Sequence, residues 1–271
     1  MKLFYVMGGG WGHLYRVHTF IRQFAISDFK ILSNNPLAQQ LFSTDEVINV
    51  PGGTREEVIS HIHHFLNTIT FDELYVDTFP AGLFGELRAT HRKSYYLARR
   101  LKWKAYQSNV RELPIRFDTT FCVEELEPAH HEYVKFASVH VASIALEYPP
   151  PHPERIPTSR IPVHKPLWLV VHSFDKEEVE TLLYYAQTAA RMEKQHPSFV
   201  VLSDQTVDDP EIVHYAWLPA CDWFPIADRI FTGGGFNVLQ QVKDFTQKVT
   251  AIPFPRQYDD QAWRIRQLRL V

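Results

Sequence analysis

The chain has 271 residues, of which 45% are hydrophobic, and it carries a formal net charge of -3 at neutral pH. This length can bury one large core or, at the usual domain size of roughly 100–200 residues, two smaller ones, and we expect two. The slightly acidic balance excludes an overall basic field of the kind expected for nucleic-acid binding.

The cysteines and the apolar segments indicate the compartment. Cys122 and Cys221 fit neither a zinc-ligand spacing nor a disulfide framework, which predicts two free thiols. The apolar run from Met1 to Met7 is too short for a signal peptide. No apolar stretch approaches the ~20 residues that span a bilayer. The sequence therefore predicts a soluble, cytoplasmic protein with at most a peripheral contact to a membrane.

The N-terminal half alternates apolar strand-like runs with amphipathic segments, from which we predict strands and helices in turn. Thr54 followed by Glu57 is typical of a capping box at the start of a helix. Strands alternating with helices at this spacing predict a mostly parallel sheet with ligands at the carboxyl ends of its strands. The expected strands are 3–7, 29–33, 46–50, 73–79, 94–98 and 119–123, and the expected helices are 14–24, 36–42, 55–69 and 82–88.

Seven prolines fall between Pro149 and Pro166, which no helix or central strand can contain. The sequence thus predicts an α/β protein with two doubly wound, Rossmann-like domains, 1–148 and 167–271, joined by a proline-rich linker, 149–166. We expect the two domains to face each other across a ligand cleft. After the linker, the expected strands are 167–172, 199–203, 212–217, 229–232 and 249–252, and the expected helices are 176–194, 222–227, 237–244 and 260–268.

Three consecutive glycines, Gly233, Gly234 and Gly235, end one of these strands and open a helix. Such a turn can present bare backbone N–H groups and the positive end of the helix dipole to a phosphate. It is also what any tight connection from a strand to a helix requires. The motif alone leaves both interpretations open.

The stretch from Trp217 to Gln261 resembles the donor-site signature of GT-B glycosyltransferases, the class that includes plant and bacterial UDP-sugar transferases and the lipid II GlcNAc transferase. The resemblance implies a C-terminal domain that binds the nucleotide-sugar and an N-terminal domain on the acceptor side. The segments that carry it, in chain order, are Trp217-Leu218-Pro219, Ile226-Ala227-Asp228, Phe231-Thr232-Gly233-Gly234-Gly235-Phe236-Asn237, Pro253-Phe254 and Asp260-Gln261.

The resemblance also implies roles for single residues. Asp260 and Gln261 would bind sugar hydroxyls, Trp217 would lie near the nucleobase, and Asn237 belongs to the glycine-turn motif. Alternatively, Asp260 caps the last helix and Trp217 is a core residue. Gln241 stands where the family usually has a glutamate that binds the ribose, and a neutral amide can still hydrogen-bond a diol.

In the N-terminal domain, Gly10-Trp11-Gly12-His13-Leu14-Tyr15-Arg16 resembles the G-x-G-H-x-x-R start of bacterial glycosyltransferases and of nucleotide-sugar hydrolases of the same fold. The resemblance implies that Gly10, Gly12 and Arg16 form a functional loop and that His13 is a general base. An imidazole suits this role because its unperturbed pKa of about 6.5 lies near cellular pH. Asp77, at the end of another predicted strand, is the expected partner of His13. Each residue also has a structural alternative, a buried histidine and a turn-initiating aspartate.

These observations favour an enzyme that transfers a hexosyl or hexosaminyl group from a nucleotide-sugar, most simply a UDP-sugar, to an acceptor hydroxyl. The expected reaction is inverting and needs neither a metal nor another cofactor. A nucleotide-sugar hydrolase is an alternative, favoured by the few residues that follow the helix near Asp260. A non-catalytic nucleotide-sugar binder is a third possibility, motivated by Gln241 and by the glycine-poor loop 171–175.

Overall fold

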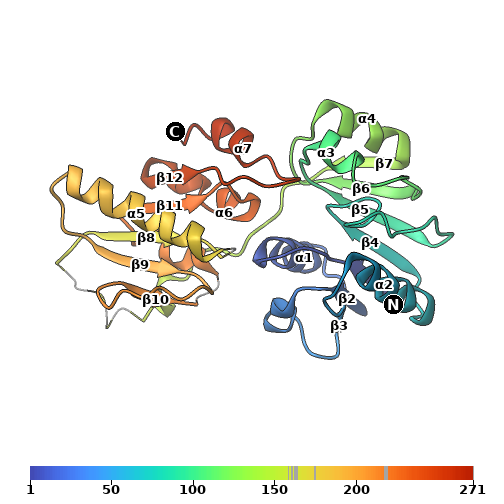
Figure 1. Ribbon diagram of the computed structural model, residues 1–271, viewed down its shortest axis with the longest axis horizontal. Coiled ribbons are helices and arrows are strands. Elements are labelled where there is room, and N and C mark those ends of the chain that lie inside the picture. The colour runs from blue at the N-terminus through green and yellow to red at the C-terminus, as the bar shows by residue number, and fades with distance from the viewer. Residues whose placement is uncertain (158, 160, 162–163, 174, 217–218, 271) are drawn as a thin grey trace. The chain divides into compact units, whose positions relative to one another are not determined.

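The chain folds into two compact units, shown in the computed structural model of Figure 1. Residues 1–271 are described except 158, 160, 162–163, 174, 217–218 and 271. Unit 1 comprises Met1–Glu147 and Gln257–Asp260, and unit 2 comprises Tyr148–Arg256 and Gln261–Val271. Among the described residues, no helix combines the length and the apolar character that crossing a membrane requires.

Unit 1 is built on a sheet whose described strands are all parallel, in the order β3-β2-β1-β4-β5-β6-β7. Strands β1 and β4 pair in the centre, with Lys2 opposite Glu73 and Tyr5 opposite Val76. The strands are β1 (Lys2–Tyr5), β2 (Phe29–Ser33), β3 (Val47–Asn49), β4 (Glu73–Asp77), β5 (Lys93–Ala98), β6 (Phe117–Cys122) and β7 (Ser138–Ser143).

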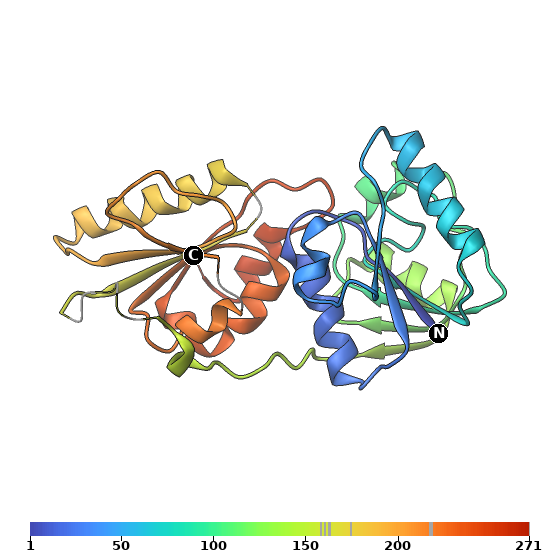
Figure 2. The same ribbon diagram turned by 90° about the horizontal axis from the view of Figure 1, so that it is seen from below.

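Helices cover both faces of this sheet because successive side chains of a strand point to opposite sides. Leu3 and Tyr5 pack with residues of α2 and α4 in one apolar cluster, while Phe4 packs with α1 in another. Figure 2 shows the helices on either side of the strands. The helical segments of unit 1 are α1 (Trp11–Gln23), η1 (Pro36–Gln40), α2 (Arg55–Thr68), α3 (Trp103–Gln107) and α4 (Pro128–Ala137).

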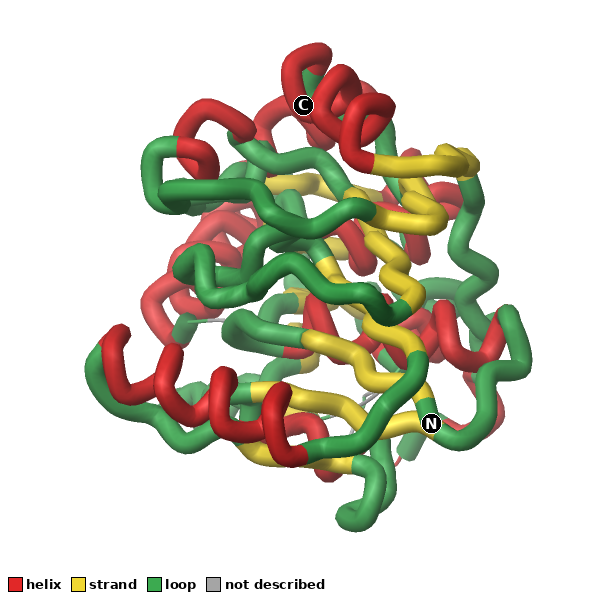
Figure 3. The backbone as a smooth tube through the Cα atoms, turned by 90° about the vertical axis from the view of Figure 1, so that its right-hand side faces the viewer, coloured by secondary structure: helices red, strands yellow, loops and turns green. Residues whose placement is uncertain are grey.

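Unit 2 repeats this plan on a smaller parallel sheet, in the order β10-β9-β8-β11-β12. Trp168 and Val170 pack against α5, and Leu169 packs with residues of α6 and α7 on the other face. Figure 3 colours the helices and strands of the whole chain. The elements are η2 (Pro153–Arg155), β8 (Leu167–Val171), α5 (Lys176–Met192), β9 (Ser198–Leu202), β10 (Val213–Tyr215), η4 (Ala220–Trp223), β11 (Arg229–Gly233), α6 (Phe236–Gln241), η5 (Lys243–Lys248), β12 (Val249–Ile252) and α7 (Gln261–Gln267).

Each sheet has one place where the strand order reverses. In unit 1 the first strand β1 lies between β2 and β4, and in unit 2 the first strand β8 lies between β9 and β11. The connections leave these neighbouring strands in opposite directions, which opens a crevice at their carboxyl ends. A ligand site is therefore expected among the residues that follow β1 and β4 in unit 1, and among those that follow β8 and β11 in unit 2.

The predicted α/β fold class is confirmed, and several elements have the predicted bounds, among them β2 and β12. The capping box at Thr54 is present, with the side chain of Thr54 accepting from the backbone N–H of Glu57. The helix predicted over 82–88 is wrong. Gly82 and Gly85 have φ angles of 86° and 83°, which a right-handed helix cannot contain. Helices α3 and α4 and strand β7 are present although the sequence patterns did not predict them.

Residues 257–260 lie in unit 1, whereas the sequence predicts that they belong to the domain of residues 167–271. The carbonyl of Tyr258 accepts a hydrogen bond of 2.8 Å from the backbone N–H of Lys102. The carboxylate of Asp259 pairs with Arg99, and the ring of Tyr258 contacts that of Phe79. Short-range sequence patterns could not predict that residues 257–260 belong to unit 1, because the residues that they contact are far away along the chain.

His130 gives unit 1 a testable dependence of stability on pH. Its ring is fully buried, stacks on Trp103 at 4.3 Å and contacts the Tyr96 hydroxyl, while Nδ1 has no hydrogen-bond partner among the described residues. Burial lowers the pKa of His130 to about 3. Because the unfolded chain binds this proton near pH 6.5, the stabilisation is fully present above pH 6.5 and is lost as the pH falls.

We expect the free energy of unfolding to fall by about 2 kcal/mol between pH 7.5 and pH 5 through His130 alone. His130→Phe retains the stacking on Trp103 and should flatten this part of the pH dependence. His131→Gln, at the exposed neighbouring position, should keep the wild-type slope. Urea denaturation followed by circular dichroism measures all three proteins, and equal slopes for wild type and His130→Phe would contradict the assignment.

Candidate active site

His13, Asp77 and Arg16 meet at the reversal point of the unit 1 sheet. His13 lies in the first turn of α1, just after β1, and Asp77 is the last residue of the neighbouring strand β4. The Nδ1 atom of His13 lies 2.6 Å from Oδ2 of Asp77. Arg16, one turn further along α1, donates to both carboxylate oxygens, with Nε at 2.7 Å from Oδ1 and Nη2 at 2.6 Å from Oδ2. The structure thus brings together three of the N-terminal residues that the sequence singled out, His13, Arg16 and Asp77.

The charges of this cluster are balanced. Burial alone would raise the pKa of Asp77, but the Arg16 guanidinium and the His13 ring hold it well below its usual range. Burial lowers the pKa of His13, which outweighs the opposite effect of the Asp77 carboxylate. At neutral pH the site therefore holds an ionised aspartate, an arginine and an uncharged imidazole.

The tautomer of His13 follows from this arrangement. A carboxylate only accepts hydrogen bonds, so the contact with Asp77 places the proton of the neutral ring on Nδ1. The Nε2 atom then carries a lone pair and can accept a proton. The His13 side chain is 13% exposed, so the ring is not fully closed off from solvent. An imidazole oriented by a buried carboxylate in this way is suited to general-base chemistry.

The glycines before His13 shape the loop around its ring. Gly8 has a φ of 131°, and a Cβ at this position would lie 2.7 Å from the His13 ring. Gly10 has a φ of 68° and its carbonyl accepts from the side chain of Asn35 at 2.6 Å. Gly12 differs because no residue beyond its chain neighbours and the backbone of its own helix lies within 4 Å of the position of its Cβ. Packing therefore does not require glycine there.

The phenyl ring of Phe79 stacks on the His13 imidazole, with ring centroids 5.6 Å apart. Thr78, between Asp77 and Phe79, has a positive φ of 66°, which is uncommon for a residue other than glycine. Its carbonyl accepts from the Tyr96 hydroxyl at 2.7 Å and its hydroxyl accepts from Arg16 at 2.6 Å. These contacts hold the end of β4 and thereby the carboxylate of Asp77.

In unit 2 the side chain of Gln261 fastens the glycine turn. Its Oε1 accepts from the backbone N–H groups of Gly234 and Phe254, both at 3.0 Å. Arg264 donates to the carbonyl of Gly234 at 2.6 Å. Gln261 is 5% exposed, so the side chain predicted to bind sugar hydroxyls lies in the core of the turn. The Gly234 N–H is occupied by this contact, and the N-cap position of α6 is Gly235, which has no side chain that could cap the helix.

The other predicted donor-side residues have varied surroundings. The Oδ1 of Asn237 accepts from the Tyr148 hydroxyl at 2.8 Å, and Gln241 is the half-buried last residue of α6. The carboxylate of Asp260 belongs to unit 1, where it lies 3.5 Å from Nε of Arg100. Trp217, the expected neighbour of the nucleobase, lies outside the described residues.

His172 is a candidate site residue that the sequence analysis did not select. It follows β8 directly, and a Cβ on Gly233 would lie 3.0 Å from its ring. Its Nε2 lies 2.6 Å from Oε2 of Glu178, which is also paired with Arg256. The sequence did indicate one relevant feature of His172, its position at the carboxyl end of the first strand of the unit. The loop that contains it lacks glycines and was therefore not expected to bind a phosphate.

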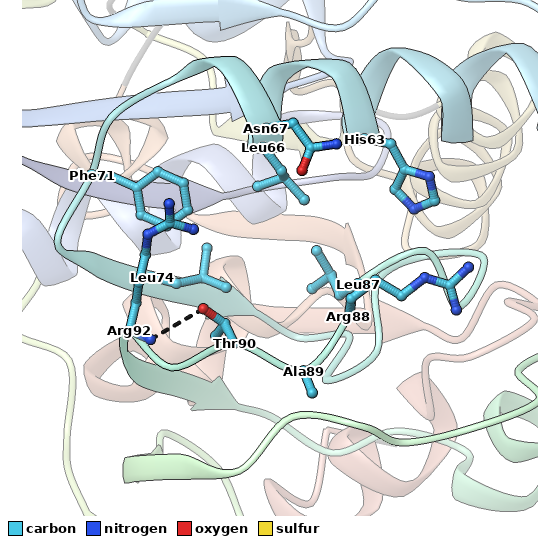
Figure 4. A pocket seen from close by; sticks show the side chains of 10 residues that line it. All are labelled: His63, Leu66, Asn67, Phe71, Leu74, Leu87, Arg88, Ala89, Thr90 and Arg92. Atoms are coloured by element: carbon cyan, nitrogen blue, oxygen red, sulfur yellow. Dashed lines mark hydrogen bonds between the residues drawn. The ribbon is translucent and has the colours of Figure 1, made fainter.

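A separate hollow of about 320 Å³ lies at the amino ends of β4 and β5. Figure 4 shows apolar side chains such as Leu74 and Leu87 inside it and arginines at its margins. None of the predicted site residues lines it. Within the described part of the chain, no group of three or more histidine, cysteine, aspartate or glutamate side chains is placed to hold a metal ion.

No protein-family model and no curated protein matches the chain. Solved structures share its fold. One is the glycotransferase of kitacinnamycin, at 12% identity and a TM-score of 0.60, with 99% of this chain and 84% of that chain covered. Another is a glycosyltransferase from Streptomyces sp. SF2575 complexed with thymidine diphosphate, at 10% identity and a TM-score of 0.55, covering 99% and 85%.

A UDP-N-acetylglucosamine 2-epimerase from Rickettsia bellii is similar too, at 9% identity and a TM-score of 0.57, with 92% of this chain and 78% of that chain covered. These similarities show that the chain has the GT-B fold, as the sequence predicted. At these identities the likenesses establish the fold alone, and the chemistry has to be argued from the residues.

The glycine turn provides a test of local packing. A Cβ on Gly234 would lie 2.7 Å from Cβ of Gln261 and 3.0 Å from its backbone oxygen, whereas a Cβ on Gly235 would meet only Val238, at 3.6 Å. We expect Gly234→Ala to lower the free energy of unfolding by about 1–3 kcal/mol. Gly235→Ala is the matched control and should change it by less than about 0.5 kcal/mol. Chemical denaturation compares the two, and equal effects would show that Gln261 does not pack against the turn in this way.

Proposed function

We propose that the protein is a glycosyltransferase that moves a hexosyl or hexosaminyl group from a nucleoside-diphosphate sugar to an acceptor hydroxyl. The observation that carries the proposal is the His13–Asp77 pair, in which a buried carboxylate orients a partly exposed, neutral imidazole. The GT-B fold supports it because glycosyltransferases share this fold with the chain. Unit 1 would hold the acceptor and unit 2 the donor.

The proposed reaction is a single displacement. His13 Nε2 takes the proton of the acceptor hydroxyl while the acceptor oxygen attacks the anomeric carbon of the sugar. The bond from that carbon to the phosphate oxygen breaks, its electron pair leaves with the nucleoside diphosphate, and the anomeric configuration inverts. Asp77 stabilises the imidazolium that forms, and Arg16 keeps Asp77 ionised throughout.

For the donor, we propose a site at the glycine turn. Gly235 has no side chain and only Val238 lies near the position of its Cβ, so an anion such as a diphosphate can approach the backbone closely there. The buried guanidinium of Arg264, held at the Gly234 carbonyl, adds positive charge beside the same turn. Donor binding and leaving-group stabilisation would then need no metal ion. A UDP-sugar is the first donor to test.

The proposal predicts that His13→Ala lowers the turnover of a nucleotide-sugar by about 10²- to 10⁴-fold, the usual contribution of a general base. Affinity for the donor should remain within about twofold, because His13 belongs to unit 1 and the donor contacts are assigned to unit 2. Release of nucleoside diphosphate, measured over a panel of donors and lysate-derived acceptors, supplies the rate. His140→Ala, an exposed histidine of the edge strand β7, is the matched control and should retain wild-type turnover.

Three outcomes would change the assignment. Free sugar released without an acceptor would assign a nucleotide-sugar hydrolase, in which water takes the place of the acceptor at His13. A rearranged sugar still attached to its nucleotide would assign an epimerase. Full turnover by His13→Ala would remove the general-base role.

A further inference from the structure

A charged cluster of His172, Glu178 and Arg256 lies at the reversal point of the unit 2 sheet. His172 follows β8, Glu178 lies in the first turn of α5, and Arg256 follows β12. Nε2 of His172 lies 2.6 Å from Oε2 of Glu178, and Nη1 of Arg256 lies 2.5 Å from the other oxygen, Oε1. Arg256 also pairs with Oε2 through Nη2. One carboxylate therefore orients both the imidazole and the guanidinium.

The ring of His172 is fixed against the glycine turn. Its centroid lies 5.2 Å from that of Phe254, and its Nδ1 lies 3.0 Å from where a Cβ on Gly233 would be. A side chain at position 233 would therefore displace the ring. Because Nε2 is turned to Glu178, the second nitrogen, Nδ1, is the one that lies beside the turn. The side chain is 11% exposed.

We propose that His172 binds the diphosphate of the donor through Nδ1 and takes up a proton as the donor binds. This inference rests on the proposed function, because it assigns a ligand to the same donor site. The inference adds a titratable side chain to the proposed donor site. It also predicts that the affinity for the donor depends on pH.

The protonation state follows from hydrogen-bond chemistry. The Glu178 carboxylate accepts the proton on Nε2, so a neutral His172 presents a lone pair at Nδ1. A phosphate oxygen also presents lone pairs, and the two repel. Protonation converts Nδ1 into a donor and gives the ring a positive charge, so a bound anion and a bound proton stabilise each other.

Several charges act on the ring of His172. Burial lowers the pKa of His172, Glu178 and Asp175 of the α5 N-terminus raise it, and Arg256 lowers it, with a net decrease. Asp204, which follows β9, also interacts electrostatically with His172. The free protein consequently holds a neutral His172 at neutral pH. A diphosphate adds negative charge beside Nδ1 and raises the pKa, which requires proton uptake on binding.

Isothermal titration calorimetry with UDP-glucose, dTDP-glucose and GDP-mannose tests the inference. A nucleotide-sugar is the right probe because its diphosphate, esterified at both ends, does not itself titrate near neutral pH. For the tightest of the three we expect the affinity to rise about tenfold from pH 7.5 to pH 6. Titrations in buffers of different ionisation enthalpy should show an uptake of about half a proton to one proton per ligand.

His172→Gln keeps a side chain that can donate to Glu178 but cannot titrate. We expect its affinity to be independent of pH and about tenfold lower than that of wild type at pH 6, with no proton uptake. His214→Gln is the matched control in the same sheet, where the ring contacts the carbonyl of Ser203 at 2.9 Å, and it should retain the wild-type slope. NMR titration of the His172 ring in the wild-type protein, with and without ligand, gives the same answer should the variant fail to fold.

A wild-type affinity that does not change with pH, or an unchanged slope in His172→Gln, would overturn the inference. Failure of all three donors to bind would overturn both this inference and the proposed donor site. Proton-linked binding without any turnover would support the role of His172 and contradict glycosyl transfer, so the two proposals can fail separately.

Discussion

The parallel pairing of β1 with β4 is the constraint on which the N-terminal site depends. Their register aligns Tyr5 with Val76, so the residues that follow the two strands emerge at the same edge of the sheet. The chain then turns in opposite directions into α1 and into the loop after β4. His13 and Asp77, 64 positions apart in the chain, meet there because of this geometry. The pairing of β8 with β11 brings His172 to the glycine turn in the same way.

The buried charge of Asp77 determines the chemistry of unit 1. A carboxylate that is 1% exposed is costly to bury unless it is paired, and Arg16 offsets that cost with two hydrogen bonds. Arg16 also limits how strongly Asp77 can attract a second proton to His13. The result is a neutral imidazole with a defined tautomer, which is the state a general base needs before it reacts. The G-x-G-H-x-x-R spacing places both partners of Asp77 on one turn of α1.

The polar side chains of unit 2 have other contacts than the sequence predicted. Gln261 connects the glycine turn to the segment after β12, and its oxygen is used by two backbone N–H groups. Its contribution is structural, because these contacts hold the turn in place. The proton-linked role falls instead to His172, whose second nitrogen faces the turn. In both units a carboxylate therefore orients an imidazole, through Nδ1 in His13 and through Nε2 in His172.

The sequence by itself determined the features that are encoded locally. The alternation of apolar runs, the capping box at Thr54 and the strand that ends in three glycines predicted the α/β class and most elements, because neighbouring residues specify them. Such patterns also drew attention to His13 and Asp77 as residues at strand ends. Only the tertiary structure decided which strand ends are neighbours. It placed Asp260 beside Arg100, buried Gln261 in the turn and brought His172 to Gly233. These contacts join residues that are far apart in the chain. They depend on strand order and side-chain packing, and no local sequence pattern encodes either.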